Sequence, residues 1–336
     1  MLQVYKNDKH PIYMCFIDLS KAFDSIPKKL MIDKLHALLP SSNFLHLLVK
    51  LLTEKKYKIL FNGVESDAFC LQNGLPQGDS LSPTLFSIFM NDLAKEIYSN
   101  IEQTNAAIIG DLHVPCLIYA DDILLMSNDK DGLMKQINLV QKFCNLNGLE
   151  INYDKTKVMI QNARHDYDYI NIDFDDDVKQ IEVVKEYKYL GFWISHNTKK
   201  HLISLAKKGK QAAYLTAKKL KEFGSINGTI VKNTFEMLTL SKMQYGGEFC
   251  FYNKLSELNK IQFQFYKRFY HLSTTTANYC LKGEFGLLPV EYYFDKAALN
   301  LWSKLIFSDS GSIMKTCFDH ISSNLFDNKY LLGVGE

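Results

Sequence analysis

The sequence lacks the features that mark membrane-spanning or secreted chains. Among its 336 residues there is no run of about 18 or more apolar side chains, so we expect no membrane-spanning helix. The first eight residues do not have the basic and then apolar plan of a secretory signal. We therefore expect an intracellular protein, located in the nucleus, the cytoplasm or both, and not a secreted one.

The cysteines do not form a metal-binding or disulfide pattern. No Cys-x-x-Cys pair occurs among the seven, the number is odd, and most of them lie in apolar runs. This usage predicts buried thiols in a reducing compartment, with neither zinc ligation nor a disulfide framework. The cysteines are Cys15, Cys70, Cys116, Cys144, Cys250, Cys280 and Cys317.

Charge is nearly balanced in total but unevenly distributed. The net charge is +2, and the apolar content of 47% is typical of a globular protein with two or three domains. Residues 185–271 carry 16 Lys plus Arg against 5 Asp plus Glu, whereas residues 165–184 are acidic. A basic segment in a near-neutral chain indicates a polyanionic partner, and a solvated helical surface is the alternative.

Hydrophobic periodicity predicts strands alternating with helices in the first two thirds of the chain and helices after about residue 199. We expect a strand at 12–19, helices from 27 and over 43–53, and a hairpin over 56–72 that turns at Asn62 and Gly63. Further helices are predicted at 82–100 and 130–147, the latter closed by Gly148. Strands are predicted at 158–160 and 187–194.

Two adjacent carboxylates, Asp121 and Asp122, interrupt an apolar stretch that reads CLIYADDILLM over 116–126. Burying such groups is costly unless a partner compensates them, and a divalent metal ion is the usual partner of hard oxygen ligands. A hairpin would present the pair at its tip. Asp18, at the end of the first apolar run, can supply a third carboxylate for a two-metal site with ions ~3.5–4 Å apart. The alternative for each aspartate is a capped turn.

Five blocks in order over 12–194 resemble the reverse transcriptase family. They read FIDLSKAFD at 16–24, LPQG at 75–78, YADD at 119–122, GLEINYDKTK at 148–157 and YLG at 189–191. The wording around the first two blocks resembles the non-LTR (LINE-type) retrotransposon polymerases most closely. Downstream, YGGE at 245–248 and EFGLLP at 284–289 resemble the helical region that follows the palm in those elements.

This resemblance implies a fold and a division of the chain. The fold is α+β, a right-hand polymerase palm with an antiparallel sheet backed by helices, followed by a mainly helical thumb-like region. Residues 1–196 would form the palm with residual fingers elements, 197–285 a thumb-like nucleic-acid-binding region and 286–336 a C-terminal helical tail.

The resemblance also implies an activity and its metal site. The activity is RNA-directed DNA synthesis, in which dNTPs are added to a primer 3′-OH on an RNA template. Asp18 and Asp121 would hold two Mg²⁺ ions, with Mn²⁺ as a substitute, assisted by the Leu19 carbonyl, and Asp122 would position the primer end or one metal.

Around this centre the resemblance assigns a nucleotide pocket. Phe23 would exclude a 2′-hydroxyl, Gln77 and Gly78 would line the incoming nucleotide, and Lys155 would neutralise phosphate charge. The alternatives are a core Phe, a helix-capping Gln and a solvated Lys.

Contacts to the primer and the duplex are assigned further along the chain. Tyr189, Leu190 and Gly191 would form the primer grip, a plain hairpin being the alternative. Lysine-rich helices over 199–221 would follow duplex phosphates. Aromatic residues of 263–270 would either stack on nucleic acid or fill a core.

The chain departs from the family in having only about 17 residues before Asp18, where the family has a long fingers region. No endonuclease, RNase H or Cys/His knuckle pattern is visible. We therefore expect weak or absent polymerase activity from this chain alone. Competing functions are a catalytically inactive retroelement-derived nucleic-acid-binding scaffold, an intron-maturase-type or telomerase-like polymerase and an RNA-dependent RNA polymerase. Phe23 argues against the last of these.

Overall fold

The computed structural model describes residues 10–163, 167–174, 177–195, 199–224, 226–249, 255–308 and 311–326. By their contacts the residues divide into two compact units. One comprises the described residues up to Lys185, and the other comprises those from Glu186 to Phe326. Each unit is described by itself.

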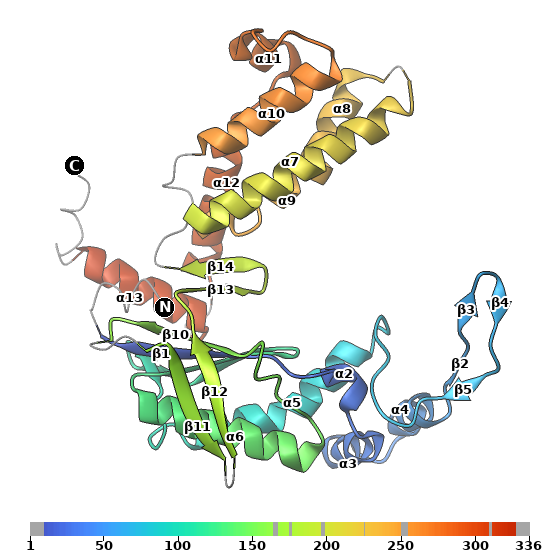
Figure 1. Ribbon diagram of the computed structural model, residues 1–336, viewed down its shortest axis with the longest axis vertical. Coiled ribbons are helices and arrows are strands. Elements are labelled where there is room, and N and C mark those ends of the chain that lie inside the picture. The colour runs from blue at the N-terminus through green and yellow to red at the C-terminus, as the bar shows by residue number, and fades with distance from the viewer. Residues whose placement is uncertain are drawn as a thin grey trace. The chain divides into compact units, whose positions relative to one another are not determined.

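The first unit is built on a six-stranded sheet with the order β11-β12-β10-β1-β9-β8 (Figure 1). All neighbouring strands are antiparallel except β10 and β12. The apolar strand β1 lies inside the sheet, with β10 on one side and β9 on the other, which fits its almost continuous burial. The strands are β1 (Ile12–Ile17), β8 (Cys116–Tyr119), β9 (Asp122–Ser127), β10 (Lys157–Gln161), β11 (Tyr169–Phe174) and β12 (Asp177–Val183).

Two long helices, α5 (Ser82–Ser99) and α6 (Lys130–Asn147), pack against this sheet and form its main core (Figure 1). Phe86 and Phe89 of α5 and Ile137 of α6 are buried with Cys15 and Leu125 of the sheet. Helix α6 begins where the Asp129 carboxylate accepts the Gly132 amide and ends at Gly148 with φ 68°. The capping and the apolar period together define α6 as the sequence predicts.

The described part of this unit also contains three shorter helices and three small hairpins. One hairpin pairs β6 (Ala107–Ile109) with β7 (Leu112–Val114). The helices are α2 (Ala22–Ser25), α3 (Lys28–Leu38) and α4 (Asn43–Thr53). In the other two, the outer hairpin pairs β2 (Lys56–Tyr57) with β5 (Phe69–Cys70), and the inner one pairs β3 (Leu60–Phe61) with β4 (Val64–Glu65). Asn62 and Gly63 turn the inner hairpin with φ 49° and 80°, as predicted.

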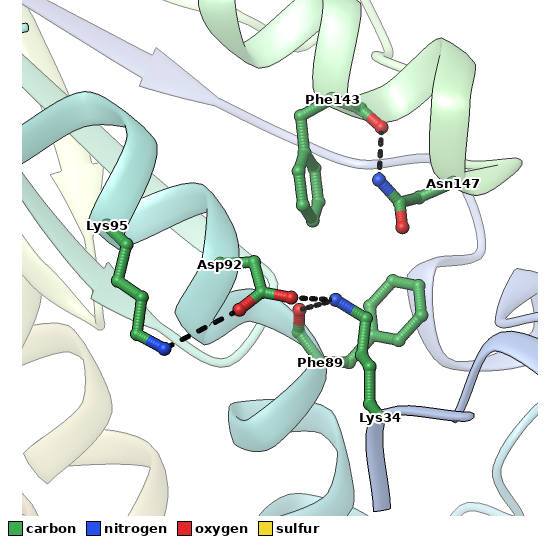
Figure 2. Close-up of polar contacts among 6 residues, drawn as sticks. All are labelled: Lys34, Phe89, Asp92, Lys95, Phe143 and Asn147. Atoms are coloured by element: carbon green, nitrogen blue, oxygen red, sulfur yellow. Dashed lines mark hydrogen bonds and ion pairs between the residues drawn. The ribbon is translucent and has the colours of Figure 1, made fainter. Parts of the chain in front are cut away.

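Lys34 ties α3 to α5 at their junction with α6 (Figure 2). Its ammonium forms an ion pair with Asp92 and lies 4.9 Å from the centroid of the Phe89 ring, on the same helix as Asp92. The carbonyl of Phe89 accepts a hydrogen bond from the same ammonium at 3.5 Å. These contacts fix α3, and with it the segment after β1, against the core.

The second unit is a hairpin followed by helices around their own core. Phe235, Tyr266 and Phe294 are fully buried there. The elements are β13 (Glu186–Tyr189), β14 (Phe192–Ser195), α7 (Lys199–Lys221), α8 (Gly228–Phe235), the π-helix η1 (Glu236–Leu240), α9 (Ser241–Met243), the 3₁₀ helix η2 (Gly247–Phe249), α10 (Ser256–Phe269), α11 (Asn278–Phe285), α12 (Val290–Ile306) and α13 (Ile313–Phe326).

The predicted fold class is confirmed, with a mixed sheet backed by helices and then a helical region. Of the cysteines, Cys15, Cys116 and Cys144 are buried as predicted, but Cys70 and Cys280 are exposed, and Cys250 lies outside the described residues. Cys70 is exposed because its hairpin contributes no residue to the hydrophobic core of this unit. No helix in the described part of the chain combines the length and hydropathy that a bilayer crossing requires.

The contact boundary at Lys185 lies ahead of residue 196, the end of the predicted palm domain. Hairpin β13–β14 groups with the helices because Phe192 packs on His201 of α7, with ring centroids 4.0 Å apart. The functional division of the chain stays a prediction.

Candidate active site

The YADD block forms the predicted hairpin tip. Tyr119 pairs with Asp122 across β8 and β9, which leaves Ala120 and Asp121 as a two-residue turn. Ala120 has φ 52°, a conformation that costs a residue with a Cβ roughly 1–2 kcal/mol. The buried residues Ile123 to Met126 anchor the tip to the core. Strain held by a well-packed scaffold is typical of functional turns.

Strand pairing brings Asp18 to this tip. Ile17 of β1 pairs with Ile123 of β9, so Asp18 lies beside Asp122 where the paired strands end. The backbone on either side of Asp18 is held by the GLEINYDKTK block. The Asp18 carbonyl accepts the Asn152 amide at 2.8 Å, and the Asp18 amide donates to Thr156 Oγ1 at 3.3 Å. The first, third and fourth predicted blocks thus converge through hydrogen bonds and strand register.

The three carboxylates interact electrostatically. Burial raises the pKa of Asp122, and the negative charges of Asp121 and Asp18 raise it further. Such a set of oxygen donors fits a hard divalent cation, because a cation removes the repulsion and replaces the lost hydration. Within the described residues, no three His, Cys, Asp or Glu side chains converge closely enough to hold a metal ion as they stand.

Lys155 lies at the same centre. Its Nζ is 3.6 Å from Asp18 Oδ2, although its side chain is 69% exposed. The Lys155 ammonium therefore contacts Asp18 as well as solvent. Leu19 is buried and bridges to Ile151, while the metal-binding role of its carbonyl stays a prediction.

Phe23 and the LPQG loop are joined by backbone hydrogen bonds. The Leu75 amide donates to the Phe23 carbonyl, and the Gly74 amide donates to the Ile26 carbonyl, both at 2.8 Å. Gly74 permits this approach, since a Cβ there would lie 2.7 Å from the Asp24 carbonyl oxygen. The half-buried Phe23 ring stacks on Phe86 with centroids 4.3 Å apart, so it is supported by the core without being enclosed in it.

Gln77 and Gly78 are exposed at the far end of this loop. Gln77 does not cap α5. The Asp79 carboxylate accepts the Leu81 amide at 3.1 Å, and Ser82 Oγ donates to the Pro76 carbonyl at 2.7 Å. Asp79 also pairs with Lys55, whose hydrogen bond lowers the pKa of Asp79. Sequence reasoning missed this turn, in which the Asp79 side chain accepts the amide two residues further on.

The YLG block forms the tip of β13–β14 in the second unit. Tyr189 pairs with Phe192, and both turn residues, Leu190 and Gly191, have positive φ at 47° and 83°. A two-residue hairpin turn with positive φ at both positions favours glycine, so a leucine at position 190 is uncommon. The carbonyl of Leu190 accepts a hydrogen bond from the Tyr245 hydroxyl. The tip is therefore held from outside its own two strands.

The buried His201 holds the same hairpin through strand β14. Its Nδ1 accepts the Trp193 amide at 3.3 Å, and its Nε2 lies 2.8 Å from the Tyr245 carbonyl. Because a protein carbonyl only accepts, Nε2 carries the proton and the ring is neutral. Burial lowers the pKa of His201. Sequence reasoning missed His201, because a single histidine between Lys200 and Leu202 gives no signal of this role.

Comparison with known proteins decides the family. The profile described as reverse transcriptase (RNA-dependent DNA polymerase) matches residues 2–194, more than half of the chain. The chain belongs to the reverse transcriptase family. By that description, reverse transcriptases make DNA on an RNA template, and the family generally uses divalent metal ions.

Curated relatives of this reverse transcriptase chain come from mobile elements. It is 29% identical over 143 residues to the polyprotein of the Drosophila melanogaster element R2DM, and these residues are 43% of the chain and 13% of that protein. It is 26% identical over 200 residues to the RNA-directed DNA polymerase of the mobile element jockey from Drosophila funebris, covering 57% of the chain and 20% of the relative. The predicted likeness to non-LTR retrotransposon reverse transcriptases is confirmed.

Among solved structures, this reverse transcriptase is similar to telomerase from Candida tropicalis. The TM-score is 0.47 with 13% identity, and the match covers 94% of this chain and 55% of that chain.

Proposed function

We propose that this chain is the polymerase part of a non-LTR retrotransposon protein and catalyses RNA-directed transfer of dNTPs onto a primer 3′-OH. The carrying observation is that strand register sets Asp18 beside Asp122 at the hairpin tip that also holds Asp121, and that burial, and then the charges of Asp121 and Asp18, raise the pKa of Asp122. A charge cluster of this kind is costly to the fold and suits a polymerase centre.

In this proposal Asp18, Asp121 and Asp122 hold two Mg²⁺ ions. When bound, these supply charge neutralisation for the attacking and leaving oxygens. The chain's residues do the rest. Phe23, supported by Phe86, lies against the sugar of the incoming nucleotide and selects for a 2′-hydrogen.

Lys155 exchanges its contact with Asp18 for a phosphate oxygen of the substrate. Gln77 and Gly78 contact the nucleotide from the loop that is bonded to the Phe23 segment. The hairpin tip at Leu190 and Gly191 supports the primer backbone, with Tyr245 and His201 as positioning residues.

A primer-extension assay tests the activity directly. The full chain is given a DNA primer on an RNA template, dNTPs and Mg²⁺ or Mn²⁺. We expect weak but measurable metal-dependent extension that Asp18→Asn lowers about 10³-fold, because several kcal/mol of transition-state charge stabilisation are lost at 1.36 kcal/mol per tenfold. Extension that Asp18→Asn leaves unchanged would contradict the proposal. A wild-type chain that binds template and primer but never extends would support the inactive scaffold instead.

A further inference from the structure

The second unit contains a basic groove that is lined by no residue assigned to the metal centre, the nucleotide pocket or the primer grip. It is a cavity of about 710 Å³ between α7 and α10. Its floor is apolar and partly made of small side chains, and its rim is cationic. The lining residues that matter are Lys210, Tyr214, Lys218 and Lys221 on α7, and Gln264 and Arg268 on α10.

Most of the positive charge on this rim is not neutralised locally, although Lys210 interacts electrostatically with the Glu257 carboxylate. No Asp or Glu lines the groove. No ion pair or hydrogen bond joins the Lys218 ammonium or the Arg268 guanidinium to another residue in the described part of the chain. Lys221 contacts only the Arg268 carbonyl and His271, which are not acidic. The groove therefore presents unpaired cations that attract an anion.

The cationic path continues past Arg268. A second cavity of about 260 Å³ shares Gln264 and Arg268 with the first and adds Lys267. Arg268 lies at the junction, and a planar guanidinium suits bidentate binding of a phosphate. Lys260 also lines the second cavity but already pairs with Glu257, so it is not counted here.

The groove has the length and the aromatic side chain that a nucleic-acid strand requires. Lys210 and Lys221 are 11 positions apart on one helix, about 16 Å at 1.5 Å per residue. That length is enough for a few consecutive phosphates of one strand. Tyr214 stands between them with 65% of its surface exposed. An aromatic side chain beside a cationic track is the arrangement that binds unpaired bases.

We propose that the α7–α10 groove binds a single-stranded segment of nucleic acid. The phosphates lie against Lys210, Lys218, Lys221 and Arg268, and a base stacks on Tyr214. This goes beyond the polymerase activity and uses none of its carboxylates. It also differs from the predicted contact of the whole lysine-rich segment with duplex phosphates, because a base held in a duplex is not free to stack on Tyr214.

A matched pair of charge reversals tests the groove. Lys218 and Lys219 are both exposed neighbours on α7, but Lys219 lines a different cavity on the α8 side. Binding of labelled oligouridine RNA, oligothymidine DNA and a duplex of the same length is measured by fluorescence anisotropy against salt, in EDTA and without dNTPs. Primer extension is not needed, so a chain that fails to polymerise still gives a result.

We expect Lys218→Glu and Arg268→Ala to weaken single-strand binding and to lower the slope of log affinity against log salt by about 0.7 for each phosphate that the variant no longer neutralises. Lys219→Glu should leave both the affinity and the slope unchanged. Tyr214→Leu should weaken binding at least fivefold, whereas Tyr214→Phe, which keeps the stacking face, should not. All four residues are exposed, so these variants should keep the wild-type melting temperature.

A preference for the RNA or the DNA strand, or equal binding of both, supports the single-strand assignment and tells which strand the groove accepts. Equal reductions in affinity from Lys218→Glu and Lys219→Glu would overturn the groove. Duplex binding as tight as single-strand binding, or no effect of Tyr214→Leu, would overturn the single-strand assignment.

Discussion

At the scale of single residues, the carboxylates proposed to bind metal at the candidate centre also destabilise the fold. Asp122 is half-buried beside Asp121 and Asp18, and its pKa is raised by burial and by their charges. Folding therefore disfavours ionisation of the Asp122 carboxylate. A loss of folding free energy of this kind is typical of sites where a bound cation or a reaction needs the charge.

The first prediction is that Asp122→Asn stabilises the metal-free chain at neutral pH while it abolishes extension. A raised folded-state pKa means that the folded state binds more protons than the unfolded state above about pH 3.8, so stability is lost as pH rises through that window. The melting temperature of Asp122→Asn minus that of wild type should grow with pH and then level off. Melting curves in EDTA measure it.

Addition of Mg²⁺ supplies the control for this prediction. A cation at the centre should raise the melting temperature of the wild type more than that of Asp122→Asn. A variant that melts below wild type at pH 7 in EDTA would contradict the electrostatic explanation.

The second prediction concerns Phe23, whose half-buried ring is supported by Phe86. Phe23→Ala should relax the preference for dNTPs over rNTPs by about 10–200-fold, the range for one missing group in a pocket. Phe23→Tyr keeps the ring and is the matched control. Single-nucleotide incorporation with each nucleotide type measures it, and an unchanged sugar preference in Phe23→Ala would refute the role.

At the scale of elements, the LPQG loop depends on one close approach. Gly74→Ala would place a Cβ 2.7 Å from the Asp24 carbonyl oxygen at φ +85°, whereas Gly63, also at positive φ, has open space around it. The third prediction is that Gly74→Ala raises the KM for dNTP and destabilises the chain by more than Gly63→Ala, for which about 1–2 kcal/mol of left-handed strain is expected. Equal costs in chemical denaturation would show that the loop does not need this close approach.

The hairpin β13–β14 is another element held from outside, by His201 and Tyr245. Because burial lowers the pKa of His201 below its usual 6.5, its contribution to stability is present above that pH. It is lost as pH falls through 6.5 toward the lower folded-state value.

The fourth prediction is therefore a melting temperature that falls between pH 7.5 and 5.5 in wild type and changes less in His201→Gln. His36→Gln, at an exposed histidine of α3, should behave like wild type. If the melting temperature of His201→Gln depends on pH as strongly as that of wild type, groups other than His201 cause the dependence.

At the scale of the whole molecule, much of the fold was accessible from sequence because its local signals agree. The apolar period and Gly148 predict α6 to the residue, and β1 is a plain apolar run. The candidate carboxylates Asp121 and Asp122 were found because an acidic pair inside an apolar stretch is conspicuous. The aromatic residues Phe265 and Tyr266 prove to be core, so the stacking alternative for them was wrong.

The parts that were missed depend on contacts distant in sequence. Strands β11 and β12 run through an acidic segment, and their buried residues, such as Ile170 and Ile181, are recognisable only once the sheet is known. The support of the YLG tip by Tyr245 joins residues 55 apart. Such pairings are fixed by tertiary packing and not by propensity.

The most direct test of the polymerase centre compares two aspartates in equivalent turns. Asp121 is the second residue of the β8–β9 turn, and Asp111 is the second residue of the two-residue β6–β7 turn. Primer extension by the full chain with Mg²⁺ is measured for Asp121→Asn and Asp111→Asn. Extension should fall about 10³-fold in Asp121→Asn, from the loss of several kcal/mol of charge stabilisation, and stay at the wild-type level in Asp111→Asn. Wild-type extension by Asp121→Asn would contradict the account.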